Sequence, residues 1–115
     1  MKIGIVGSSS LLSYERFVER LSFFSFDSSD TIIAGNCPRG ADNLAERFAK
    51  EKKLKLEVIP TEWTVYQTTA LVRRNLEMAE KCDFVIFIHD YKAKEYVSIL
   101  RFCANLKVPF TVVFW

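Results

Sequence analysis

The chain has 115 residues and a mass of 13.3 kDa, enough for one hydrophobic core and too little for two, so we expect a single domain over residues 1–115. Sixteen Lys and Arg against fourteen Asp and Glu leave a net charge of +2, which argues against a protein dedicated to binding duplex nucleic acid. Three cysteines without metal-ligand spacing and a single histidine argue against a zinc site.

Five short apolar runs, rich in β-branched and aromatic residues, predict buried strands of a parallel sheet. In chain order they are residues 2–6 (KIGIV), 31–34 (TIIA), 56–59 (LEVI), 84–88 (FVIFI) and 110–114 (FTVVF). Apolar residues at helical spacing predict helices between them, over 14–21, 41–48, 72–79 and 93–100. This alternation predicts an α/β fold, a Rossmann-like three-layer sandwich with a five-stranded, mostly parallel sheet.

Four loops follow the predicted strands, and in a parallel sheet the carboxyl ends of the strands share one edge, where ligands bind. The loops are GSSS (7–10), NCPRGAD (36–42), PTEW (60–63) and HDYK (89–92). We therefore expect the candidate functional residues of these loops to lie along one edge of the sheet.

The first loop is small and rich in hydroxyl groups. Gly7 lets the backbone approach a ligand closely, and Ser8, Ser9 and Ser10 add side-chain donors, as a phosphate site requires. The spacing is not that of a dinucleotide-binding GxGxxG motif, and the lysine of a P-loop is missing. A plain turn before a helix capped by Ser13 is the alternative.

The second loop builds a rigid corner at a helix start. Pro38 fixes one φ angle, Gly40 permits a conformation that other residues avoid, and Asp42 falls in the first helical turn. The N–H groups around Ala41, with the guanidinium of Arg39 beside them, favour a phosphate or a carboxylate as ligand. The alternative is an ion pair between Arg39 and a neighbouring carboxylate.

The segment after the third strand combines aromatic and basic residues. Trp63 and Tyr66 would form a wall for a nucleotide base, unless they pack in the core or in a lid. A helical rotation of about 100° per residue points Arg73 and Arg74 in different directions, so at most one of them faces the crevice, with Asn75 next in sequence.

Other reactive side chains receive plainer interpretations. Cys37 lies near a helix start, where a thiolate is favoured, but no base stands in a visible relation to it. Cys82 and Cys103 are expected in the core. His89 and Asp90 end the fourth strand near the crevice, where a lone histidine is more often a hydrogen-bonded structural residue.

Taken in order, these segments resemble the small stand-alone YspA-like branch of the SLOG superfamily, a Rossmann-like group that includes cytokinin-activating LOG phosphoribohydrolases and the DNA-processing protein DprA. The resemblance spans nearly the whole chain and is carried by IGIVGS, RGADNLAERFAKEK, IPTEW and RRNLEMAEKCDFVIFIHD. It implies a nucleotide-binding Rossmann-type domain. The positions that match the family pattern are Gly7, Ser8, Arg39, Gly40, Asp42, Trp63, Tyr66, Arg74, Asn75 and Met78.

The chain departs from this family pattern at positions that matter for phosphate binding. Ser9 stands where the family has an arginine, and Asn36 and Cys37 stand where it has two glycines. Gln67–Thr68 replaces a Gly-Lys pair, and HDYKAKEYV has no counterpart of a Gly-Thr phosphate turn. A side chain at positive φ costs about 1–2 kcal/mol, so we expect a reshaped phosphate cradle. The LOG-type signature PGGxGTxxE is missing, which argues against phosphoribohydrolase activity.

Three functions remain open. The first is binding of a nucleotide or nucleotide-derived small molecule, for sensing or sequestration, without a cofactor or metal. Its predicted ligand-binding residues are Gly7, Ser8, Ser9, Ser10, Arg39, Gly40, Ala41, Asp42, Trp63, Tyr66, Arg74 and Asn75. The second is N-glycosidic cleavage of a nucleotide, with Asp42, Asp90 or Glu95 as the catalytic carboxylate. The third is single-stranded nucleic-acid binding, against which the small net charge argues.

We also expect the chain to be cytoplasmic and to self-associate. MKIGIVGSSS is unlike a signal peptide, no apolar run approaches the length of a membrane span, and an odd number of cysteines fits a reducing compartment. The stretches LSFFSF (21–26) and FTVVFW (110–115) carry more apolar residues than one core face needs, and homo-oligomerisation would cover them. The alternative is that both stretches complete the core.

Overall fold

The computed structural model describes residues 1–61, 69–90 and 98–115, in which strands and helices alternate. The strands are β1 (Lys2–Gly7), β2 (Thr31–Gly35), β3 (Lys55–Ile59), β4 (Phe84–His89) and β5 (Phe110–Phe114). The helices are α1 (Tyr14–Arg20), α2 (Ala41–Glu51), α4 (Ala70–Lys81) and α5 (Ser98–Leu106). The predicted α/β sandwich is confirmed, with a sheet that is parallel throughout, in the order β3-β2-β1-β4-β5.

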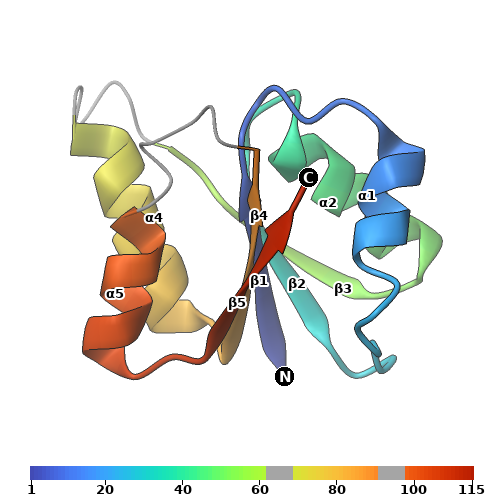
Figure 1. Cartoon of the computed structure of the whole chain (residues 1–115). Coiled ribbons are helices and arrows are strands. Elements are labelled where there is room, and N and C mark those ends of the chain that lie inside the picture. Colours follow the sequence, from blue (N-terminus) through green and yellow to red (C-terminus); the bar gives the residue numbers. More distant parts are fainter. Residues whose placement is uncertain (62–68, 91–97) are drawn as a thin grey trace.

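The sheet is covered on both faces, by α1 and α2 on one side and by α4 and α5 on the other (Figure 1). Ile5 packs with Phe17 in the core under α1 and α2, whereas the next residue, Val6, packs with Met78 and Ile99 under α4 and α5. Successive side chains of a strand point to opposite faces, so a strand covered on both sides needs apolar residues throughout. This explains why the strands have continuous apolar runs.

Local signals at the helix ends agree with the sequence. The Ser13 cap of α1, which belongs to the plain-turn alternative for the first loop, is present, because the Ser13 hydroxyl oxygen accepts a hydrogen bond from the Arg16 N–H (3.2 Å). Cys82, which ends α4, packs against Gly4 of β1, where a Cβ atom would lie only 2.6 Å from its sulfur. The helix predicted over 93–100 is observed from Ser98 onward, and residues 93–97 lie outside the described part of the chain.

The strand order reverses between β1 and β4. From β1 the chain passes to β2 on one side, and from β4 it passes to β5 on the other. Ligands of such sheets bind outside the carboxyl ends of the strands at this reversal. The topology therefore places the candidate site where β1 and β4 end, at Gly7 and His89.

Candidate functional site: the carboxyl edge of the sheet

The loops at the carboxyl edge are joined to one another in the order of their strands. Three hydrogen bonds make these links: Ser10 Oγ to Asp90 Oδ2 (3.4 Å), Ala41 N–H to the Ser8 carbonyl (3.1 Å) and Thr61 N–H to Asn36 Oδ1 (3.1 Å). The first joins β4 to β1, the second β1 to β2, and the third β2 to β3. The predicted convergence of these loops on one edge is thus confirmed for the described residues.

The serine turn after β1, residues 8–10, is held by its own side chains. The Ser8 hydroxyl oxygen accepts a hydrogen bond from the Ser10 N–H (3.0 Å) and lies 2.6 Å from the Ser10 hydroxyl oxygen. Ser8 is buried, Ser9 is half-buried and Ser10 is exposed. The turn is therefore held by its own hydrogen bonds, and its outer two residues are accessible from solvent.

Gly40 brings the helix start of α2 directly against the serine turn. Its φ of 82° lies in the region that favours glycine, and a Cβ atom there would overlap the backbone of Ser9. One N–H group of the helix start, that of Ala41, already donates to the Ser8 carbonyl. An anion at this corner would therefore meet the turn and Arg39 more readily than it would meet that N–H group.

Arg39 lies exposed beside this corner. Within the described residues its side chain makes no hydrogen bond or ion pair, so the alternative of pairing with a neighbouring carboxylate finds no partner there. Its guanidinium is available to an anionic ligand at the mouth of the crevice.

Asp42 and Arg74 form a buried ion pair at the carboxyl edge. Nη1 of Arg74 lies 3.3 Å from Oδ2 of Asp42, and the two side chains are 2% and 4% exposed. Nη2 of Arg74 donates to Oδ1 of Asn75 (3.0 Å), and Nδ2 of Asn75 donates to Oγ of Ser98 (3.0 Å) at the start of α5. The predicted ligand-binding residues Asp42, Arg74 and Asn75 thus join α2, α4 and α5 in one polar network.

The same carboxylate fixes the loop after β2. Oδ1 of Asp42 accepts a hydrogen bond from the N–H of Gly35 (3.3 Å), and Oδ2 accepts one from the N–H of Cys37 (3.2 Å). Any Cβ atom on Gly35 would overlap Nη1 of Arg74, so only glycine lets the guanidinium lie over the end of β2. Gly35 is not among the residues predicted for the site, although a glycine ending an apolar run before a loop marks a close approach of this kind.

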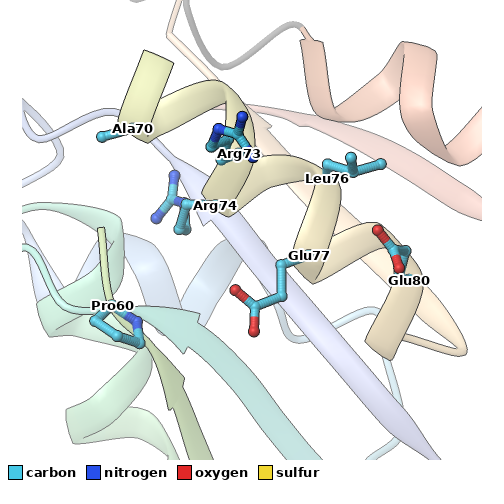
Figure 2. Close-up of a pocket in the computed structure, with 7 residues that line it drawn as sticks. All are labelled: Pro60, Ala70, Arg73, Arg74, Leu76, Glu77 and Glu80. Carbon is cyan, nitrogen blue, oxygen red and sulfur yellow. The ribbon is translucent and has the colours of Figure 1, made fainter. Parts of the chain in front are cut away.

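A groove of about 370 Å³ runs along α4 beside the end of β3 (Figure 2). Its lining residues are Pro60, Ala70, Arg73, Arg74, Leu76, Glu77 and Glu80. Figure 2 shows Arg74 and Glu77 extending from α4 toward the side where Pro60 lies. Sequence reasoning missed the two glutamates of this groove, although Arg73, Glu77 and Glu80 stand at the i, i+4, i+7 spacing of one helix face.

Several predicted residues fall outside the described part of the chain, namely Trp63, Tyr66 and Glu95. In residues 1–61, 69–90 and 98–115, no group of three potential metal ligands occurs, and no helix is long and apolar enough to cross a membrane. Burial raises the pKa of the Cys82 thiol to about 12 and also raises that of Cys103, so both behave as core residues, as predicted.

Comparisons of the chain with protein-family models, with curated proteins and with solved structures gave no match.

Proposed function

We propose that this chain binds a nucleotide or a nucleotide-derived small molecule at the carboxyl edge, with its phosphate against the serine turn and Arg39. The observation that supports this most directly is the contact between Gly40 and Ser9. It brings together two segments, each of which the sequence indicates as a phosphate site, at the reversal of strand order where such sheets bind ligands. The resemblance to the SLOG superfamily favours the same class of ligand.

The accessible donors suit a phosphate group. Ser9 offers a hydroxyl group at the outer side of the turn, and Arg39 offers a guanidinium that is not used elsewhere in the described structure, whereas the Ser10 hydroxyl is already bonded to Ser8 and Asp90. One charge-assisted hydrogen bond contributes about 1.5–3 kcal/mol, whereas micromolar affinity needs about 8 kcal/mol. The ligand must therefore also bury apolar surface, as the ring of a nucleoside would.

The buried network has a supporting part in this proposal. Asp42 holds the backbone at Gly35 and Cys37, and Arg74 holds Asp42, so the loop that carries Arg39 starts from a fixed point. Direct contact between Asp42 and a ligand would require the hydrogen bonds of its carboxylate to open. We therefore assign phosphate binding to the exposed donors and positioning to the buried pair.

The position of Asp42 argues against its use as the catalytic carboxylate of N-glycosidic cleavage. Both of its oxygens accept hydrogen bonds from the protein, and the side chain is 4% exposed. A general acid or base needs an oxygen within hydrogen-bond reach of the substrate. Of the three candidate carboxylates, Asp42 is thus the one that this geometry makes unsuitable for cleavage.

Arg39→Ala tests the proposal. A thermal-shift screen of nucleotides, cyclic nucleotides and ADP-ribose derivatives identifies a ligand, because a ligand at 100 times its dissociation constant raises the free energy of unfolding by about 2.7 kcal/mol. Titration calorimetry with that ligand should show affinity falling by roughly tenfold or more in Arg39→Ala, as loss of a charge-assisted bond predicts. The melting temperature without ligand should stay unchanged, since Arg39 is exposed.

Arg47→Ala is the matched control. Arg47 is an exposed arginine in the last turns of α2, the helix that follows Arg39. It pairs there with Glu51 (3.3 Å), away from the serine turn. Its replacement should leave the affinity as in the wild type. A screen without any stabilising nucleotide, or equal affinities of Arg39→Ala and the wild type, would contradict the proposal.

A further inference from the structure

The two edges of the sheet differ in how they are protected. The edge strand β3 carries Lys55 and Glu57, and Glu57 forms ion pairs with Lys81 (3.2 Å) and Lys2 (3.8 Å). Charged residues on an edge strand discourage pairing with another chain. The other edge strand, β5, has the sequence FTVVF and carries no charge. Charged residues thus protect only the β3 edge from pairing with another chain.

The uncharged β5 edge is also accessible. In the described part of the chain, no strand pairs with the outer side of β5. Phe110 and Phe114 are 40% and 56% exposed, with the Phe114 ring edge-on to His89, and Leu106, at the end of the preceding helix, is 46% exposed. An uncharged, apolar edge of this kind is a template for a further strand.

The backbone groups that face outward follow from those that face β4. Pro109 and Trp115 form backbone hydrogen bonds to β4, of 3.0 and 2.9 Å. The N–H and C=O of one strand residue point to the same side, and those of the next residue point to the opposite side. The backbone of odd-numbered residues therefore faces β4, and that of Phe110, Val112 and Phe114 faces the outer edge.

We propose that β5 pairs with β5 of a second copy of this chain, antiparallel about a two-fold axis at Val112. In this register Val112 stands opposite its own counterpart, and Phe110 stands opposite Phe114 of the other copy. The strand is thus self-complementary, since every outward-facing backbone group meets one on the partner and the two phenylalanines form cross-strand aromatic pairs. A two-fold contact of this type closes after two copies and leaves no further edge of the same kind.

This pairing is independent of the proposed ligand site. It joins two five-stranded sheets into one continuous sheet. Because the paired strands are antiparallel, the two carboxyl edges lie at opposite ends of that sheet. Dimerisation and nucleotide binding can therefore fail or succeed separately.

A pair of double variants tests both the interface and its register. Phe110→Lys with Phe114→Lys places lysine opposite lysine, so sedimentation velocity should show a monomer, or a dimer dissociation constant raised at least tenfold. Phe110→Lys with Phe114→Glu places lysine opposite glutamate in the proposed register and should restore the dimer. Only this register pairs the two positions, so rescue is specific to it.

The wild-type chain should sediment as a dimer of the 13.3 kDa chain at tens of micromolar. Val58→Lys is the matched control, because Val58 is a partly exposed apolar residue on the other edge strand and its replacement should leave the dimer intact. Hydrogen exchange adds a check on folded protein, since the Val112 amide should gain protection with concentration while the Thr111 and Val113 amides stay protected throughout. A monomeric wild type, a dimeric lysine–lysine variant, or a folded lysine–glutamate variant that stays monomeric would overturn the proposal.

Discussion

At the scale of single residues, Asp42 and Arg74 do the most to hold the local structure at the carboxyl edge. The two lie 32 positions apart in sequence and meet with almost no exposure to solvent. A buried charge without its partner is far more costly than a buried pair, because its lost hydration is no longer compensated. Each residue therefore stabilises the fold by pairing with the buried charge of the other.

Replacement of either partner should be strongly destabilising. We expect Asp42→Asn and Arg74→Met each to lower the free energy of unfolding by about 3–5 kcal/mol. The double variant should lose clearly less than the sum of the two, because it leaves no unpaired charge. Urea denaturation of the four proteins in a double-mutant cycle measures this coupling. Additive losses would show that the ion pair is not the source of the effect.

This pair also marks what sequence patterns could not predict. Helical rotation indicated that Arg73 and Arg74 point in different directions, and the structure shows Arg74 buried and Arg73 exposed. The pattern could not say that the inward arginine would meet Asp42, because α2 and α4 lie on opposite faces of the sheet (Figure 1) and the contact passes over the end of β2. A Cβ atom on Gly35 would overlap both side chains, so this glycine leaves the space in which they meet.

At the scale of elements, the strands were predictable and the helix contacts were not. Each apolar run became a strand within one residue of its predicted ends, because burial on both faces demands a continuous apolar stretch. The RGAD corner was recognised as a helix start, and Gly40 does adopt positive φ. Its direct packing on the serine turn is tertiary, which no local pattern of either segment encodes.

The start of α2 should depend on this packing. Gly40→Ala should lower the free energy of unfolding by more than the ~1–2 kcal/mol that positive φ costs a residue with a Cβ atom, because the new methyl group would also overlap the backbone of Ser9. It should also weaken ligand binding, since the serine turn must move. Thermal denaturation and ligand titration measure the two effects.

Asn43→Ala provides the control for this element. Asn43 is exposed in the first turn of α2, and alanine favours a helix, so its stability should match or exceed that of the wild type. A Gly40→Ala protein as stable as Asn43→Ala would contradict the close contact between the corner and the turn.

At the scale of the whole molecule, both cores are built on the same strands. Ile32 and Ile33 are neighbours in β2 and fully buried, yet Ile32 packs under α1 and α2 while Ile33 packs under α4 and α5. If a strand leaves the sheet, its side chains leave both cores at once. The two helical layers should therefore unfold together.

Ile32→Val and Ile33→Val test this cooperativity with the same chemical change on opposite faces. Each removes one buried methyl group and should lower the free energy of unfolding by about 0.5–1.5 kcal/mol. Urea unfolding followed by far-UV circular dichroism and by alkylation of Cys103, which is buried on the inner side of α5, should give coincident transitions in both variants. Val72→Ala, at an exposed position of α4, should leave the midpoint close to that of the wild type. If Ile32→Val shifted the dichroism transition without shifting the transition seen by Cys103 alkylation, the two faces would be separate folding units. In a cooperative fold, the shared sheet transmits the loss of stability from one face to the other.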